Sequence, residues 1–440
     1  MAHLTNNFSE WVNQQVDGDS PFAFSEALRS ASLSKLATGV FPTRKDEEWK
    51  YTPLADLFDS KPGEETAGVL DTEFIRSLKQ AMPSAHTIVF LNGEYSEEYS
   101  DSRAMLEDSG LSISRLPQLE GTALKLAEDT ILKSTLTDDN IFQHIALGLS
   151  QNGLFIEVKK NVECQTPIHV IYISTARGVT AFTSPVNVIR VSSNSHLKVV
   201  EQYASLGEAT VITVPASYVQ LEDGAGLDYY KIGMENAKTN HICNTSVRVA
   251  GSGTFRSHQY LLGSNLTRSN LEVSFTGPGA EAVLRGVYLG DEKQHLDVRT
   301  YLDHAHPHCS SDQHFRGILN GHSRGVFNGL VLVREHAQKT DAQQSNKNLL
   351  LSRDARIDTK PQLEIFADDV KCTHGATVGE LDSDALFYLQ SRGIDQKDAT
   401  LMLTRAFAAE VTQEIDIDSL RTYVQGKIAA SLDEIVIPSV

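Results

Sequence analysis

Cysteine is scarce in this 440-residue chain, and its four copies are too far apart to share a short motif. Structural zinc sites need pairs of ligands at close spacing, and no such pair is present. Cys164, Cys243, Cys309 and Cys372 are therefore predicted to be free thiols in a reducing compartment. A free cysteine most often packs as a small buried hydrophobic residue, so that interpretation stands beside any functional one.

Long apolar runs and an excess of basic residues are also missing. No segment approaches the ~20 apolar residues that a membrane-spanning helix requires. The first residues have neither the basic nor the apolar part of a signal peptide. The formal net charge of −18 opposes binding to nucleic acid or to anionic lipid, because both need a basic surface. These features predict a cytoplasmic protein that binds neither nucleic acid nor membranes.

The motifs of common enzyme classes are absent too. The sequence has no P-loop, no GxSxG nucleophile elbow and no HExxH metalloprotease motif. The stretch from Gly277 to Ala282 imitates a dinucleotide-binding loop, but strand-like residues follow it where that motif requires a helix. We therefore expect a protein that is not an enzyme on its own.

Residues 1–150 are predicted to be mixed, with helix predominant. Apolar residues at i, i+3, i+4 and i+7 predict one helix face, formed by Phe24, Ala27, Leu28 and Ala31. A second helix is predicted from Asp138 to Leu149, with an apolar face formed by Ile141, Ile145, Ala146 and Leu149. Between them, the run from His86 to Leu91 followed by Asn92 and Gly93 predicts a strand entering a tight turn.

Residues 151–380 contain short β-prone runs separated by turn residues and almost no helical periodicity. The clearest runs are 154–158, 168–173, 186–191, 197–200, 211–214, 283–289, 315–319 and 326–333. Strands without crossover helices exclude a doubly wound sheet and leave a sandwich, a barrel, a propeller or a β-solenoid. The echo of Leu284–Val287 at Phe315–Ile318 favours the solenoid slightly, because solenoid coils repeat at a coarse period.

Residues 381–440 return to helical periodicity. A helix from Ser383 to Ser391 is predicted to end at Gly393, since glycine suits the left-handed position past a helix C-terminus. Asp395 is predicted to cap a second helix from about Gln396 to Glu414. The apolar stripe of this helix either packs on its own domain or faces another subunit. The stripe consists of Ala399, Met402, Leu403, Ala406 and Phe407.

One group of histidines is a candidate metal site. If the segment is extended, His304, His306 and His308 point to one side of it, close to Cys309. Pro307 argues against this arrangement, because proline interrupts strand pairing. Solvated or internally satisfied histidines are the plainer interpretation.

Cys372 and His374 are a second candidate. An extended chain would place this thiol and this imidazole on the same face. Two ligands cannot complete a four-coordinate site, so a partner chain would have to supply the others. A buried cysteine beside an exposed histidine is the competing interpretation.

Several blocks of the sequence resemble the SufB/SufD family of iron–sulfur cluster assembly proteins. They are Phe41–Leu54, Gly153–Val158, Thr166–Val170, Pro307–Leu319, Lys360–Gly379, Phe387–Ile394 and Ala406–Phe407. The block Lys360–Gly379, which contains Cys372 and His374, is the most specific. Within the family the chain is more similar to the SufD branch, because SufB proteins carry more cysteines.

The resemblance implies a mainly β protein in three parts. These are an N-terminal helical or mixed region over residues 1–150, a right-handed parallel β-helix over 151–380 and a C-terminal helical domain over 381–440. It implies a non-catalytic scaffold of a SufBCD complex, which pairs with SufB and binds the SufC ATPase. The hairpin from Ser383 to Glu414 would dock SufC, and the residues implied are Phe387, Tyr388, Arg392, Met402 and Phe407.

The resemblance also implies a role for Cys372 and His374. They would hold iron or a nascent iron–sulfur cluster transiently at the SufB interface, and the lone chain would hold no cofactor stably. ATP-driven motion of SufC would open that interface. Whether the assembled complex binds a flavin stays open, as does homodimerisation through an open β-helix end. Two alternatives remain: a purely structural subunit, and a cupin-like metalloenzyme built on His304, His306 and His308.

Overall fold

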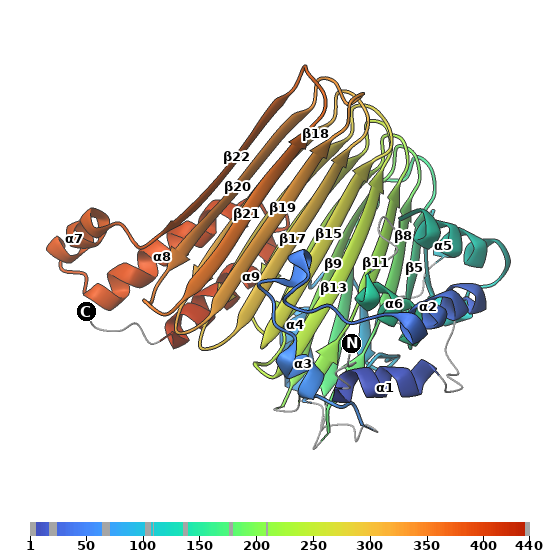
Figure 1. The fold of residues 1–440 in the computed structure, drawn as a ribbon, viewed down its shortest axis with the longest axis horizontal. Coiled ribbons are helices and arrows are strands. Elements are labelled where there is room, and N and C mark those ends of the chain that lie inside the picture. Colours follow the sequence, from blue (N-terminus) through green and yellow to red (C-terminus); the bar gives the residue numbers. More distant parts are fainter. Residues whose placement is uncertain are drawn as a thin grey trace.

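Two long β-sheets face each other along the molecule, with helices at both ends (Figure 1). The computed structural model describes residues 6–16, 24–63, 71–101, 107–108, 110–134, 140–175, 179–207 and 210–435. The first sheet has the strand order β2 (Glu94–Tyr95), β1 (His86–Leu91), β6 (Ile168–Thr175), β9 (His196–Leu206), β12 (Gly226–Met234), β14 (Thr254–Leu261), β16 (Glu281–Gly290), β18 (Ser310–Leu319), β20 (Asp341–Leu350) and β22 (Lys371–Gly379).

The second sheet runs beside the first. Its order is β21 (Arg356–Ile365), β19 (Arg324–Val333), β17 (His295–His304), β15 (Leu266–Phe275), β13 (Thr239–Val249), β11 (Ala216–Leu221), β8 (Val186–Val191), β5 (Gly153–Val158), β4 (Leu111–Arg115) and β3 (Glu107–Asp108). The short strand β10 (Val211–Thr213) pairs with β13 and with β7 (Ala181–Thr183).

From β12 onward, consecutive strands alternate between the two sheets, so each pair of strands makes one coil of a solenoid. Each strand pairs in parallel with the strand of the next coil, as β16 does with β18 and β17 with β19. This arrangement confirms the predicted parallel β-helix core flanked by helices. It excludes the sandwich, whose sheets are antiparallel. Strands from the first 150 residues extend both sheets, since β1 pairs with β6 and β4 pairs with β5.

Side chains of the β-helix strands alternate between the interior and the outer face. On β16, Leu284 and Tyr288 belong to the interior core, whereas Val287 and Leu289 pack beneath the C-terminal helices. This alternation follows from the two-residue period of a strand. The interior therefore runs as one core along the stacked coils.

The sequence echo that favoured the solenoid does not follow the strand register. Gly286, and not Leu284, pairs with Phe315. A Cβ atom on Gly286 would clash with the Phe315 ring, so glycine leaves the space that this ring fills. The coils repeat in structure, but Leu284–Val287 and Phe315–Ile318 are not equivalent positions.

The N-terminal region covers one end of the β-helix. Its helices are α1 (Asn7–Val16), α2 (Glu26–Thr38), α3 (Ala55–Asp59), α4 (Thr72–Lys79), α5 (Gly121–Ser134) and α6 (Ile141–Leu149), with 3₁₀ turns η1 (Glu47–Trp49) and η2 (Leu116–Gln118). The predicted turn after β1 is confirmed, because Asn92 and Gly93 have positive φ and connect β1 to β2. Helix α6 is confirmed as well and buries all four predicted residues. Residues 138 and 139 of that prediction lie outside the described residues.

Helix α2 turns a different face to the core from the one predicted. It buries Leu28, Ser32 and Leu36, whereas Ala27 and Ala31 are exposed. The reason is Gly148 of α6, where the lack of a side chain lets Ser32 and Leu36 approach closely. The predicted stripe is therefore confirmed at Leu28 and at the partly buried Phe24, and wrong at Ala27 and Ala31.

The C-terminal helices are α7 (Ser383–Ser391), α8 (Gln396–Thr412) and α9 (Asp418–Glu434). Gly393 has φ +88°, and the Asp395 side chain accepts a hydrogen bond from the Asp398 backbone N–H, so both predicted helix boundaries are confirmed. The predicted stripe of α8 is not its core face. Ala399 is buried, Leu403 and Phe407 are partly buried, and Met402 and Ala406 are exposed; the residues buried with Ala399 are Thr400, Leu401, Thr404, Ala408, Val411 and Thr412.

No described helix is long and apolar enough to cross a membrane.

Candidate functional site

The last coil of the β-helix has free strand edges. Strand β21 pairs with β19 and β22 pairs with β20, and no other described strand borders either of them. Pro361 lies within β21, and proline without an N–H is typical of an edge strand. An unpaired strand edge presents hydrogen-bonding groups to any chain that can add a strand. This end of the molecule therefore offers unpaired backbone groups at its surface.

Exposed apolar side chains gather at the same end. Phe366, directly after β21, is 64% exposed, and Ile365 and Val378 are also exposed. Large apolar residues on a terminal coil are what a buried protein interface requires.

Cys372 and His374 both lie on β22, two residues apart. In the strand register, Cys372 pairs with Ala342 and His374 pairs with Gln344. Cys372 is half-buried and packs against the interior core, whereas His374 is exposed. Residues two apart share a strand face, so the thiol and the imidazole lie on the same face of β22. They therefore lie together at the open end of the β-helix, formed by β21 and β22, which we call the mouth.

The Cys372 thiol is held in its protonated form. Burial raises its pKa above the ordinary value; a hydrogen bond with the Ala342 backbone opposes this in part, and the Asp341 carboxylate adds a smaller upward effect. The thiolate is the form that binds metals. A cation bound at this position must therefore displace the thiol proton.

The interior beneath these two residues is polar. The amide nitrogen and oxygen of Gln344 are buried and have no hydrogen-bond partner within the described structure. Next to it, Asn346 donates to the Tyr288 hydroxyl at 3.0 Å, and Asn348 donates to Asn346 Oδ1 at 2.7 Å. Buried amides need partners, so the mouth of the β-helix has hydrogen-bonding capacity to offer.

The histidine group does not form the predicted arrangement. His304 ends β17, is buried, and its Nε2 lies 2.9 Å from Ser311 Oγ. His306 and His308 lie in the turn that follows, where His308 has φ +62°. The segment is thus not extended, and the three imidazoles do not share one face. Among the described residues, no group of three or more His, Cys, Asp and Glu side chains is placed to hold a metal ion.

Cys243 lies in a buried cluster that the sequence did not reveal. Its thiol is 3.4 Å from Ser269 Oγ. Burial opposes its ionisation, but Lys231, His241 and Ser269 outweigh burial and lower the Cys243 pKa to about 7. Lys231 and His241 come from inward positions of β12 and β13, which only the register of the coils brings together.

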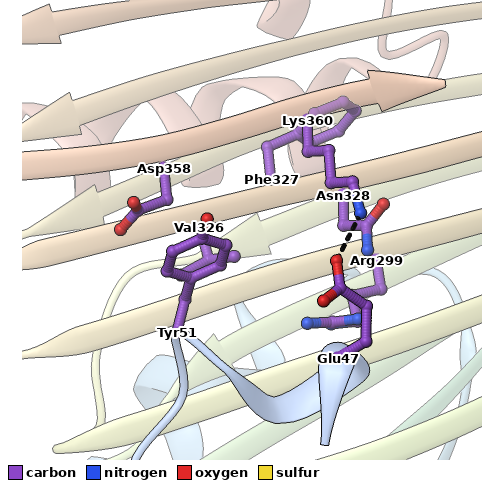
Figure 2. A pocket seen from close by; sticks show the side chains of 8 residues that line it. All are labelled: Glu47, Tyr51, Arg299, Val326, Phe327, Asn328, Asp358 and Lys360. Atoms are coloured by element: carbon purple, nitrogen blue, oxygen red, sulfur yellow. Dashed lines mark hydrogen bonds and ion pairs between the residues drawn. The ribbon is translucent and has the colours of Figure 1, made fainter. Parts of the chain in front are cut away.

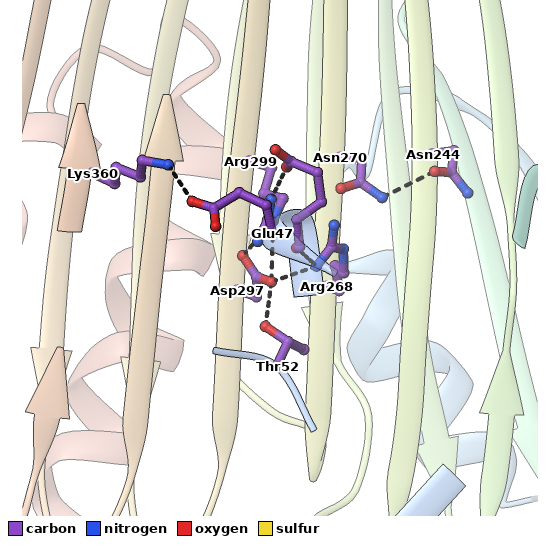
Figure 3. A network of polar contacts seen from close by, with 9 residues as sticks. Glu47, Thr52, Asn244, Arg268, Asn270, Asp297, Arg299 and Lys360 are labelled. Carbon is purple, nitrogen blue, oxygen red and sulfur yellow. Dashed lines mark hydrogen bonds and ion pairs between the residues drawn. The ribbon is translucent and has the colours of Figure 1, made fainter. Parts of the chain in front are cut away.

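An acidic segment crosses the outer face of the second sheet (Figure 3). We call residues 46–52 the strap. The Arg268 guanidinium lies 3.5 Å above the Trp49 ring, and Arg268 Nη1 is 3.0 Å from Asp297 Oδ2. The Thr52 hydroxyl donates to the same carboxylate oxygen at 2.5 Å. The middle of the strap is thus anchored to β15 and β17.

The strap reaches the last coil. Lys360 Nζ of β21 lies 2.8 Å from Glu47 Oε1, and Arg299 of β17 forms an ion pair with Glu48. Glu47, Arg299 and Lys360, together with Tyr51 and Asp358, line a cavity of about 10 Å³ (Figure 2). Such a cavity holds at most a water molecule. The contacts of this region therefore attach the strap to the last coil and leave no room for a larger ligand.

Helix α7 and the exposed face of α8 form the C-terminal helical surface, defined by Phe387, Tyr388, Arg392 and Met402. Helix α7 buries none of its residues, and Phe387 is 71% exposed. Arg392 lies 5.2 Å from the Tyr388 ring. Phe407 differs from the others, because it is partly buried against the β-helix with Arg316 5.7 Å from its ring.

Comparisons with known proteins agree with this geometry. Residues 172–407 match the family model for the SUF system FeS cluster assembly SufBD core domain, and residues 12–170 match that for the SufBD protein N-terminal region. The chain is 34% identical to the iron–sulfur cluster assembly protein SufD of Escherichia coli over 403 residues, covering 90% of each chain. It is 27% identical to a SufBD family protein of Synechocystis, covering 89% of this chain and 88% of the relative, and 26% identical to SufD of Bacillus subtilis, covering 72% of each.

Proposed function

This chain belongs to the SufB/SufD family of iron–sulfur cluster assembly proteins, and we propose that it is the SufD-type scaffold subunit of a SufBCD complex in the cytoplasm. The observation that supports the proposal is the open last coil, where Cys372 and His374 lie on a strand whose outer edge pairs with no other described strand. SufB covers that edge and supplies the ligands that two residues cannot.

Iron and the nascent cluster are cargo at this interface. A thiolate and an imidazole bind iron, and a two-ligand contribution holds it less firmly than four thiolates would. Cys372 binds as the thiolate, so capture of iron is coupled to release of the thiol proton. The Gln344 amide, which has no hydrogen-bond partner among the described residues, is paired with His374 in the strand register and can donate to or accept from a cargo atom or a SufB side chain.

SufC docks on the C-terminal helical surface. Phe387, Tyr388 and Met402 supply exposed apolar area, and aromatic anchors dominate the energetics of such contacts. Motion of SufC is passed to the β-helix through α8, which packs on β16 and β18. The chain itself contributes no catalysis. Its role is to hold, orient and release the iron or the nascent cluster.

Co-expression with SufB and SufC, followed by native mass spectrometry, tests the assembly. We expect one copy of this chain, one of SufB and two of SufC. A chain that remains alone or as a homodimer while SufB and SufC associate without it would contradict the scaffold role.

The double substitution Cys372→Ser and His374→Ala tests the site. We expect the complex to assemble normally while the yield of clusters falls at least about tenfold. Cys164→Ser is the matched control, because Cys164 is half-buried like Cys372 but lies far from the open coil. An unchanged yield in the double variant would show that the subunit is purely structural.

A further inference from the structure

A groove of about 380 Å³ separates helices α2 and α5 in the N-terminal region. Its apolar lining comes from Ala27, Leu28 and Ala31 of α2 and from Leu124 and Leu132 of α5. Gly121 lies at one end. The Ser25 hydroxyl donates to Glu128 Oε1 at 2.5 Å and joins the two helices at the start of α2.

The lining of this groove is apolar but exposed. Leu132 is 63% exposed, and Ala27 and Ala31 are exposed as well. Ala27 and Ala31 belong to the stripe that the sequence predicted as a core face, and no described segment covers them. On α5, Leu124, Glu128 and Leu132 are four residues apart and line the groove along successive turns.

The groove is far from the surfaces assigned above. In Figure 1, α2 and α5 lie at the opposite end of the molecule from β21, β22 and α7. A partner in the groove therefore does not compete with chains bound at the open coil or on the C-terminal helical surface.

The form of the groove favours a protein segment over a small molecule. Small-molecule sites usually enclose most of the ligand surface, whereas here most of the lining is open to solvent. Helix α5 has 14 residues, and at ~1.5 Å per residue its length is about 21 Å. Ala27 and Ala31 are four residues apart on α2, and Leu124 and Leu132 are two turns apart on α5; apolar residues along two helices suit the apolar face of an amphipathic helix laid between them.

The charged residues that line the groove indicate the charge of the partner. The charged lining residues are Lys125, Glu128 and Asp129, so carboxylates predominate beside the apolar rows. The chain as a whole carries −18, which repels acidic partners and attracts basic ones. We propose that the α2–α5 groove is a docking site for a basic amphipathic helix of a partner protein.

A designed peptide tests this on the full chain. The probe is an 18-residue helix with leucine on one face and lysine on the other, and its counterpart has glutamate in place of lysine. Binding is followed by fluorescence anisotropy, with circular dichroism to confirm that each variant is folded. The variants are Ala31→Glu and Leu132→Glu in the groove and Val40→Glu outside it, where Val40 is 70% exposed.

We expect the lysine peptide to bind the wild type and Val40→Glu equally and to lose at least about tenfold in affinity, or ~1.4 kcal/mol, for both groove variants. All three variants add the same negative charge, so attraction by charge alone predicts no loss anywhere. Equal binding to every variant would overturn the proposal, as would equal binding of the glutamate peptide. A concentration-dependent dimer abolished by Leu132→Glu would assign the groove to a second copy and overturn it too.

Discussion

Arg285 Nε lies 2.6 Å from Glu414 Oε2 and joins strand β16 to the turn that follows helix α8. On the next coil, Arg316 Nη2 of β18 lies 2.6 Å from Glu410 Oε2, which is four residues earlier and within α8. The C-terminal end of α8 and the turn after it are therefore each paired with an arginine of one of two adjacent coils.

Removing the second of these contacts tests how α8 is held. Arg316→Met loses the pair with Glu410 and the contact with the Phe407 ring, so we expect the free energy of unfolding to fall by about 1–2 kcal/mol. Urea unfolding measures the change, and hydrogen exchange locates it in α8. The control is Arg405→Met, whose exposed pair with Asp433 contributes under about 1 kcal/mol. Equal losses of unfolding free energy in both variants would mean that the contact of Arg316 with α8 stabilises the protein no more than an exposed ion pair does.

The strap depends on a buried carboxylate. Asp297 is fully buried between Arg268 and Arg299, and these arginines keep its pKa below the ordinary value although burial raises it. Asp297→Asn leaves the arginines without this buried charge and should cost about 3–5 kcal/mol.

Trp49 fluorescence in a Trp11→Phe background reports strap release in that variant. Asp358→Asn is the matched control, because Asp358 pairs with Arg324 in a partly exposed setting and should cost about 1 kcal/mol or less. If the folded Asp297→Asn variant gave the same Trp49 fluorescence as the folded Trp11→Phe parent, the anchoring role would be contradicted.

His196 predicts a pH dependence. Its Nε2 lies 3.1 Å from Asp228 and its Nδ1 lies 3.2 Å from Glu163, and the hydrogen bond to Asp228 is the main cause of its raised pKa. A raised folded-state pKa means that this stability is fully present below pH ~6.5 and is lost as pH rises through the folded value.

The loss of unfolding free energy caused by His196→Gln, measured between pH ~5 and ~9, should be largest at low pH and should shrink as pH rises through this window. His322→Gln, at an exposed position, should follow the wild type. A His196→Gln curve parallel to the wild type would remove His196 as the cause.

The C-terminal helical surface predicts two different phenotypes for two phenylalanines. Phe387→Ser removes an exposed ring, so SufC binding should weaken at least about tenfold with no change in melting temperature. Phe407→Ser removes a ring packed against the β-helix, so it should lower stability by about 1–3 kcal/mol. Calorimetric titration with SufC and thermal unfolding separate the two. SufC binding that survives Phe387→Ser would place the docking surface elsewhere.

Local patterns predicted the elements well because each depends on nearby residues. The turn at Asn92 and Gly93, the cap at Asp395 and the apolar face of α6 all follow from residues within a few positions of one another. The β-helix strands were visible for the same reason. The coils are joined by the register of their strands, which no sequence repeat predicts. The similar segments Leu284–Val287 and Phe315–Ile318, for example, are out of register, because Phe315 pairs with Gly286.

The buried faces of the helices were harder to predict. The sequence pattern of an apolar stripe is the same whether the stripe packs on the core or on another protein. On α2 and α8, part of each expected stripe is exposed, at Ala27, Ala31, Met402 and Ala406. The contacts of the strap were invisible too, since Thr52 and Asp297 meet across 245 positions of sequence. Cys372 and His374 could be predicted as a pair because they are close in sequence, and their role stays a prediction; their position at the open end of the β-helix depended on the stacking of the coils.

The unpaired edge of β21 and β22 has a thermodynamic consequence. In a solenoid, each coil is stabilised chiefly by its neighbours, and the last described coil has a neighbour on one side. It should therefore open locally more often than interior coils. A bound SufB would act as the missing neighbour and, by mass action, stabilise the coil that carries Cys372 and His374. Order at the cargo site would then rise and fall with the occupancy of the complex, so that a lone subunit holds iron poorly and an assembled one holds it well.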